Sequence, residues 1–221
     1  MVARRNNARC PKCGSLERHR LVWLYLKNRT DFFNKRHRVL HFAPEPIFQK
    51  IFQKMSLLRY VTADLSSSRA SLRANIMDIP LKDNSFDVVI CNHVLEHVVD
   101  DEKAMREMLR VLRPGGWALL QSPIDRQRFK TFEDPTIVSP RDRESAFGQH
   151  NHLRMYGRDY AERLQNAGFT VKVDKYVEDL EAHLVKKYGL PDEEVYFCAK
   201  PLPTTARGSN PQPLHFSVTA N

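Results

Sequence analysis

The chain has 221 residues and a mass of 25.8 kDa, the size of one ordinary to large domain. Its composition of 42% hydrophobic and 28% charged residues is typical of a soluble globular protein, and no apolar run reaches the roughly 18 residues that a membrane-spanning helix needs. Four cysteines are too few for a disulfide scaffold, and the basic N-terminus lacks a secretory leader pattern, so we expect a reducing, cytoplasmic setting.

The net charge of +9 comes from one part of the chain. Residues 1–38 hold 11 Lys or Arg and 2 Asp or Glu, whereas residues 39–221 hold 24 of each. We therefore expect a basic N-terminal arm (1–38), a neutral domain (39–200) and a tail (201–221) whose composition predicts disorder. The arm could bind nucleic acid, a phosphate-bearing ligand or an anionic membrane surface, or it could simply be solvated.

Helical spacing of apolar residues predicts helices, and β-branched or alternating apolar runs between turn residues predict strands. In chain order, the expected elements are a helix over 15–28, a strand over 38–43, a helix over 47–55, strands over 59–65, 73–77 and 86–92, a helix over 100–112, a strand over 117–121, a helix over 158–167, a strand over 170–177, a helix over 177–188 and a strand over 194–199. Ser15 is the expected N-cap of the first helix, and Asp100 or Asp101 that of the third.

Residues 124–152 interrupt this alternation. They are polar, carry charges and prolines, and show no clear period. A segment of 29 residues is long for a plain connection. We interpret it as an insertion or lid.

Strands that alternate with helices predict an α/β fold with a mostly parallel sheet. In such sheets the ligand site lies beyond the carboxyl ends of the strands. This rule brings five loops to one edge of the sheet: residues 41–46, 64–68, 78–80, 91–97 and 121–123.

Two aspartates in these loops have the chemistry to bind a nucleoside. Asp64 ends the second expected strand, where an acid holds ribose hydroxyls in nucleotide-binding α/β sheets. The alternative is an exposed acid that starts a turn. Asp78 could accept a hydrogen bond from an adenine amino group while the apolar Ile79 packs on the ring, although aspartate is also common in Pro-containing loops.

The stretch NIMDIPLKDNSFDVVICNHVLEHVVDDEKAMREMLRVLRPGGWALL resembles the middle of a class I S-adenosylmethionine-dependent methyltransferase of the type 11 domain family. The acid–Ile–Pro loop, the FDVVI strand, the NHVLEH segment and LRPGG occur in the family's order. The resemblance covers roughly residues 39–199. It implies a Rossmann-like three-layer sandwich, with a seven-stranded, mostly parallel sheet, one antiparallel strand and helices on both faces. It also implies that Asp64, Asp78, Ile79 and Asn92 bind S-adenosylmethionine.

The loop after the first strand departs from the family. Members usually carry an acid and a run of glycines there, which let the backbone approach the ligand. Here His41 stands in the place of the acid, Ala43 is the small residue, and Glu45 could bind the methionine ammonium group instead. The alternative is a degenerate loop that binds no cofactor.

Histidines near the expected cleft are candidates for acid–base chemistry. A sulfonium methyl group is already activated, so a base is needed only if the acceptor must lose a proton. His93 and His97, after the fourth strand, are the candidate catalytic residues, although a single histidine is often structural or exposed. By position in the chain, we assign four residues to acceptor binding: His150, His152, Arg154 and Tyr156.

Cys10 and Cys13, with Pro, Lys and Gly beside them, resemble half of a zinc knuckle. His19 could be a third zinc ligand, and His150 or His152 a further one that joins the arm to the insertion. The alternative is a turn with two free thiols.

Three functions follow from these observations. The first is an S-adenosylmethionine-dependent methyltransferase that acts on a small-molecule acceptor. The second is an RNA methyltransferase that uses the basic arm, although we recognise no RNA-binding module. The third is a non-catalytic binding domain whose first loop has lost its role.

Overall fold

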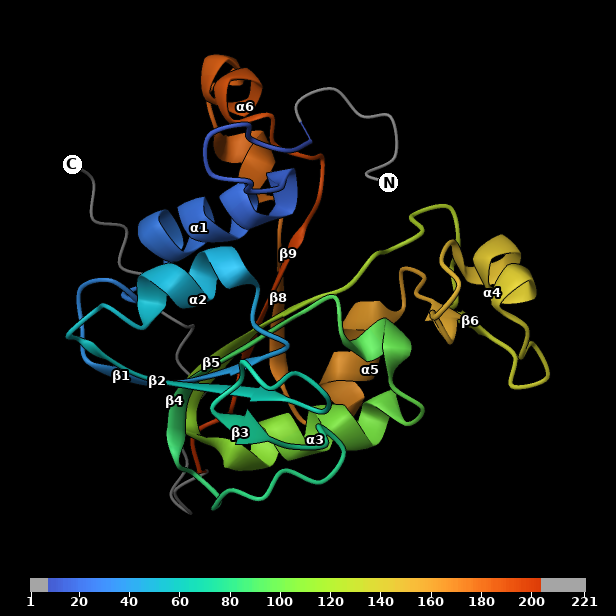
Figure 1. The fold of residues 1–221 in the computed structure, drawn as a ribbon, viewed down its shortest axis with the longest axis horizontal. Coiled ribbons are helices and arrows are strands. Elements are labelled where there is room, and N and C mark those ends of the chain that lie inside the picture. The colour runs from blue at the N-terminus through green and yellow to red at the C-terminus, as the bar shows by residue number, and fades with distance from the viewer. Residues whose placement is uncertain (1–7, 204–221) are drawn as a thin grey trace, which may run out of the picture.

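The computed structural model describes residues 8–203, and its centre is a seven-stranded sheet (Figure 1). The strands lie in the order β3-β2-β1-β4-β5-β9-β8, and within this sheet β9 alone runs antiparallel to its neighbours. They are β1 (His37–Phe42), β2 (Leu58–Asp64), β3 (Leu72–Arg73), β4 (Phe86–Asn92), β5 (Leu112–Gln121), β8 (Thr170–Asp174) and β9 (Val195–Ala199). The predicted mostly parallel α/β sheet with one antiparallel strand is confirmed.

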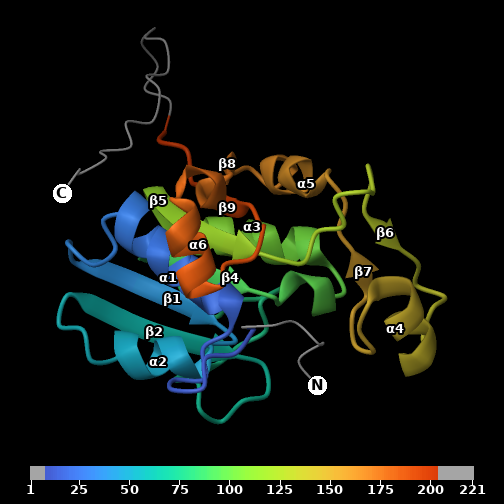
Figure 2. The ribbon, with the colours of Figure 1, turned by 90° about the horizontal axis from the view of Figure 1, so that it is seen from above.

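Helices cover both faces of this sheet (Figure 1). One face carries α1 (Glu17–Arg29) and α2 (Pro46–Phe52), and the other carries α3 (Asp101–Val111) and α5 (Tyr160–Asn166). A short helix, α6 (Ala182–Tyr188), lies beside α1 (Figure 2).

The first helix is part of the apolar core. Leu21, Val22, Tyr25 and Leu26 of α1 are buried in the same cluster as Phe48 of α2. Residues 17–29, counted in the basic arm by composition, thus cover one face of the sheet.

The centre of the sheet follows from local sequence. Every residue of β4 except Asp87 is buried, as a continuous apolar run predicts for a strand covered on both faces. β5 approaches it closely at Gly116, where a Cβ atom would lie 2.9 Å from the backbone oxygens of Asp87 and Arg113. Gly115 has a φ of +76°, which glycine adopts freely. The two glycines of the LRPGG motif therefore allow the turn from α3 into β5.

Two local predictions are wrong. Ser15 does not cap α1, because the helix begins after Leu16, whose backbone amide donates to His19 Nδ1 at 3.2 Å. The third strand has two residues rather than five. The chain turns there, with a bridge between Asn75 and Asp78. The expected cap Asp100 is confirmed, since its carboxylate accepts from the Lys103 amide at 2.8 Å.

The segment read as an insertion forms a small unit at the edge of the molecule (Figure 2). It contains α4 (Pro140–Phe147) and β6 (Phe132–Glu133), which pairs antiparallel with β7 (Arg154–Met155) just after it. Ser139 caps α4 by accepting from the Asp142 amide. The sequence showed no period here because each element is too short to display one.

Parts of two predicted regions lie outside the described residues, namely residues 1–7 of the basic arm and residues 204–221 of the predicted tail. Within residues 8–203, no helix combines the length and apolar character needed to span a bilayer.

Candidate active site

The loop after β1 buries a histidine–glutamate pair. The His41 side chain has no exposed surface, and its Nε2 lies 2.8 Å from Glu45 Oε2. Its Nδ1 lies 2.8 Å from the hydroxyl of Tyr60 on β2. Burial alone would raise the pKa of Glu45, but the hydrogen bond and charge of His41 outweigh it, and the pKa of Glu45 is lowered. Glu45 is therefore a carboxylate at the edge of the sheet.

Ala43 and Asn92 complete this end of the site. Ala43 has a φ of +45°, a conformation that usually favours glycine, and its amide donates to Ala63 at 2.8 Å. Asn92, at the end of β4, donates from Nδ2 to Glu45 Oε1 at 3.2 Å. Asn92 Oδ1 is buried and has no hydrogen-bond partner among residues 8–203. A carboxylate and an unpaired amide oxygen thus lie side by side.

The two aspartates predicted to bind a nucleoside lie at the same edge of the sheet. Asp64 ends β2 and is half-buried, and its Oδ1 accepts from the amides of Ser66 and Ser67 at 2.8 and 2.7 Å. Asp78 is exposed. Ile79 is buried, and its amide donates to Glu107 Oε2 at 2.8 Å.

The loop after β4 contains a second histidine–glutamate pair. His93 has a φ of +54° and is 26% exposed, and its Nδ1 lies 3.5 Å from Glu96 Oε1. Glu96 is buried, and its Oε2 accepts from Ser122 Oγ at 3.1 Å. Burial would raise the pKa of Glu96, but the hydrogen bond and charge of His93 lower it overall.

This second pair faces a cavity of about 360 Å³. The cavity lies between α1, the loops after β4 and β5, and the end of the insertion. Its lining residues are Glu17, Arg18, His93, Glu96, His97, Pro123, Gln149, His152 and Glu193.

His97 and His152 meet at the wall of this cavity. The centroids of the two rings are 4.8 Å apart. Next to His152, the backbone oxygen of Asn151 lies 3.1 Å from His97 Nδ1, although 54 residues separate these two in the chain. The Leu153 amide also donates to the Glu96 backbone oxygen at 2.8 Å. Burial lowers the pKa of His152, so its ring is neutral near pH 7. Two of the predicted histidines therefore lie together.

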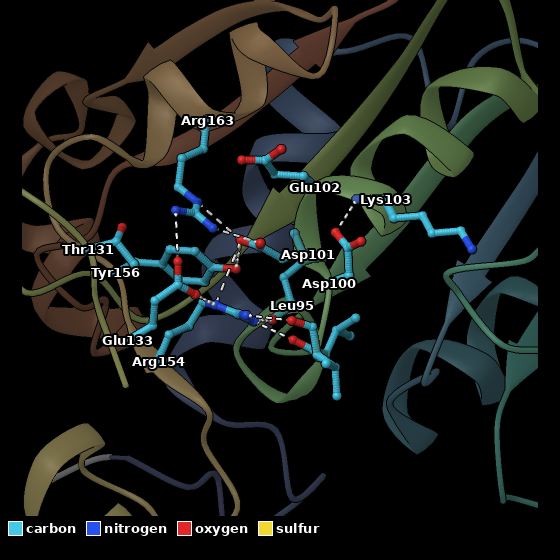
Figure 3. Close-up of polar contacts among 12 residues, drawn as sticks. Leu95, Asp100, Asp101, Glu102, Lys103, Thr131, Glu133, Arg154, Tyr156 and Arg163 are labelled. Atoms are coloured by element: carbon cyan, nitrogen blue, oxygen red, sulfur yellow. Dashed lines mark hydrogen bonds and ion pairs between the residues drawn. The ribbon is translucent and has the colours of Figure 1, made fainter. Parts of the chain in front are cut away.

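Arg154 fastens the insertion to the loop after β4 (Figure 3). Its guanidinium donates to the backbone oxygens of Leu95 at 2.9 Å, Val98, and Val99 at 3.0 Å. It also lies 2.9 Å from Glu133. Because Arg154 is 3% exposed, these contacts hold Glu96 and His97 in place from inside the protein.

The expectation that Arg154 and Tyr156 face an acceptor requires correction. Both side chains are buried, and the Tyr156 hydroxyl donates to Asp101 Oδ2 at 2.7 Å (Figure 3). Arg163 contacts the same carboxylate at 2.7 Å. Their polar atoms are engaged within the protein, so they position the site rather than contact a ligand. His150, the other predicted acceptor residue in this segment, is exposed.

The Cys10, Cys13 and His19 set does not converge as a zinc centre. Among the described residues, these three do not form a cluster of ligand atoms. His19 turns into the core, where its ring lies 5.5 Å from that of Phe48 and its Nδ1 accepts from Leu16. Cys13 is exposed and donates to Ser15 Oγ at 3.2 Å, and hydrogen bonds from Ser15 lower its pKa to about 7.

Sequence reasoning missed Glu96, Ser122 and Asp101. Glu96 had a visible signal, because it lies between His93 and His97 and a carboxylate among histidines is unusual in an apolar loop. Ser122 and Asp101 had none, since their partners come from segments far away in the chain.

Residues 50–120 match the family model described as a methyltransferase domain. A segment of 49 residues is 45% identical to the ubiquinone/menaquinone biosynthesis C-methyltransferase UbiE of Idiomarina loihiensis and makes up 22% of this chain and 20% of that protein. The sheet order and the edge loops described above agree with this match. Residues 50–120 of this chain are therefore similar to a methyltransferase domain.

Solved structures support the methyltransferase fold over a longer stretch. The [4+2]-cyclase SpnF superposes with a TM-score of 0.56 and 19% identity, covering 83% of this chain and 80% of that one. The 1,6-didemethyltoxoflavin-N1-methyltransferase of Burkholderia thailandensis, solved with its substrate and S-adenosylhomocysteine, has a TM-score of 0.52 and 14% identity, covering 84% and 78%.

The curated relatives match over a short segment. The matched residues span between 18% and 20% of the length of the first three such proteins. The family match thus covers about the middle third of the chain, and the solved structures share its fold over a longer stretch.

Proposed function

We propose that this protein is an S-adenosylmethionine-dependent methyltransferase that acts on a small-molecule acceptor. The observation that carries this proposal is that the Glu45 carboxylate lies beside Asn92 Oδ1, a buried amide oxygen without a hydrogen-bond partner among the described residues. Both are hydrogen-bond acceptors at the carboxyl ends of adjacent parallel strands. Such a pair fits an ammonium group, which has donors and no acceptor.

The other end of the edge suits a nucleoside. Asp64 keeps a second carboxylate oxygen beside the one that holds the turn, and this oxygen can accept from ribose hydroxyls. Asp78 is exposed where an adenine amino group would need an acceptor, and Ile79 supplies an apolar neighbour. These acceptor groups therefore fit S-adenosylmethionine without the family's glycines, and His41 and Ala43 hold the first loop in shape.

The acceptor is proposed to enter the cavity beside His93. A volume of about 360 Å³ lies within the range of small-molecule sites. Bound S-adenosylmethionine supplies an activated methyl group, and the protein supplies orientation and exclusion of water. His93 is the better candidate base, because the buried Glu96 carboxylate orients its Nδ1 and leaves Nε2 for the acceptor. His97 instead directs Nδ1 at the Asn151 carbonyl.

The RNA alternative has less support. Of the arm's basic residues, Arg20 donates to the backbone oxygens of Ser15 and Gly189, and Arg29 pairs with Asp179. These guanidinium groups serve the fold. By contrast, the relatives named above carry small acceptors in their names, a quinone pathway in one and a toxoflavin precursor in another.

Calorimetric titration with S-adenosylhomocysteine tests the cofactor assignment. We expect micromolar binding, which Asp64→Ala weakens by about 1–3 kcal/mol because charged hydrogen bonds are lost. Asp134→Ala is the matched control, since Asp134 also holds a turn by accepting from an amide two residues on. Absence of binding at millimolar ligand would overturn the proposal in favour of a non-catalytic domain. Acceptor screening with labelled methyl donor then tests the reaction, with RNA as one arm.

A further inference from the structure

Three side chains from two distant segments bring potential metal ligands together beside the cavity. Glu96 and His97 come from the loop after β4, and His152 comes from the end of the insertion. One ligand atom from each lies within 4.8 Å of the other two. Among residues 8–203, this is the one group of three or more such side chains that converges in this way.

The two imidazole rings are held in the tautomer that binds metal. His97 Nδ1 lies 3.1 Å from the Asn151 oxygen, and His152 Nδ1 lies 3.0 Å from the Phe147 oxygen. A backbone carbonyl can only accept, so each Nδ1 carries the proton and each Nε2 keeps its lone pair. Metal-ligating histidines are oriented in this manner, by a hydrogen bond from the nitrogen that does not bind the ion.

The charge around the cavity favours a cation. Three carboxylates line it, those of Glu17, Glu96 and Glu193, together with the guanidinium of Arg18 and the imidazole of His93. The Glu96 carboxylate is 1% exposed and has lone pairs beyond those facing Ser122 and His93.

From these observations we propose that Glu96, His97 and His152 bind a divalent first-row transition-metal ion. Two histidines and one carboxylate are the protein ligands of catalytic zinc and non-haem iron sites, which keep open positions. Here the open positions face the cavity. A tetrahedral ion with bonds of about 2 Å holds its ligands roughly 3.3 Å apart, so binding draws the three side chains together.

The ion's part in catalysis, unlike its binding, rests on the proposed function. An acceptor hydroxyl bound to the ion loses its proton more readily, and His93 lies beside it to take that proton. The substrate class is then a small molecule that presents an oxygen atom to the site.

The test is calorimetric titration of metal-depleted full-length protein with Zn²⁺, in the Cys10→Ser/Cys13→Ser background to remove the other thiol ligands. We expect about one ion per chain. His97→Ala and His152→Ala should each weaken binding by at least about 100-fold, because loss of even an outer-shell partner of a ligand costs about 10–100-fold. His183→Ala is the matched control, because His183 is an exposed histidine on α6. Circular dichroism confirms that each variant is folded.

The Co²⁺ spectrum of the same Cys10→Ser/Cys13→Ser chain gives a second measurement that needs no further variant. Nitrogen and oxygen ligands produce d–d bands without a thiolate charge-transfer band. Equal Zn²⁺ affinity in His97→Ala and the parent, no binding by the double-cysteine variant, or a thiolate band would each overturn the site. S-adenosylhomocysteine titration of the same preparation shows separately whether the cofactor assignment fails.

Discussion

Two loops at the edge of the sheet contain the same kinds of residue but differ in how accessible those residues are. The loop after β1 and the loop after β4 each contain a non-glycine residue with positive φ, Ala43 and His93. Each also has a histidine beside a glutamate whose pKa is lowered, Glu45 in one and Glu96 in the other.

The difference between them is access. His41 has no exposed surface and both of its ring nitrogens are engaged, so the first pair is a fixed structural acceptor. His93 is 26% exposed on a cavity, and its loop is held from a distance by Arg154. The same residue types therefore form a closed contact in one loop and face a cavity in the other.

The largest expected effect breaks the support of the second loop. Arg154→Ala should lower the free energy of unfolding by about 3–5 kcal/mol, because it leaves buried carbonyls and Asp101 short of a partner. Urea unfolding measures this. Arg106→Ala, which removes an exposed pair with Glu102, should cost less than about 1 kcal/mol. Equal losses would mean that Arg154 does not anchor the loop.

A pH titration tests the buried histidine of α1, His19, whose pKa responds to Glu45 in the first loop. Burial, with the positive charges of Arg18, Arg20 and His93, outweighs the attraction of Glu45 and lowers the pKa of His19 to about 4. The unfolded chain therefore binds the extra proton first, and stability is lost as pH falls from about 6.5 to 4, by up to about 3 kcal/mol.

His19→Gln should flatten this part of the stability profile. Glutamine does not titrate, and at this helical position it can still accept from the Leu16 amide. Thermal unfolding between pH 4 and pH 8 checks the difference. A variant that keeps the wild-type slope would assign the pH dependence to other groups.

Replacing each of the two glutamates by glutamine tests which of the two loops binds the cofactor. Glu45→Gln should weaken S-adenosylhomocysteine binding by about 1–3 kcal/mol, since a charged acceptor for the ammonium group is lost. Glu96→Gln should change that affinity by less than about 0.5 kcal/mol, because Glu96 faces the cavity beyond the cofactor's proposed path. Calorimetry on both variants decides, and a reversed order would exchange the roles of the loops.

The smallest expected effect concerns backbone strain. Ala43→Gly should stabilise the protein by about 1 kcal/mol, because glycine adopts positive φ without steric cost. Ala70→Gly, outside the positive-φ positions, should destabilise it by roughly 0.5–1 kcal/mol. Denaturant midpoints of the pair report the difference, and destabilisation by both would show that Ala43 carries no strain.

The sequence by itself determined the sheet and its edge. The run Phe86–Asn92, the Asp100 cap and the LRPGG turn are local patterns, so the α/β fold and the aspartates at strand ends could be predicted from them. Local periodicity reports which face of an element is buried, and strand order then follows from the family resemblance.

Only the tertiary structure decided which polar residues meet. Glu96 and His97 are 54 or more residues from Asn151 and His152, and no pattern at that separation predicts their contact. The same holds for Arg154 and Tyr156, whose interior partners come from the other segment. Side-chain burial depends on how distant segments pack. For that reason only the tertiary structure showed that His41 in the first loop is fully buried while His93 in the second loop is partly exposed.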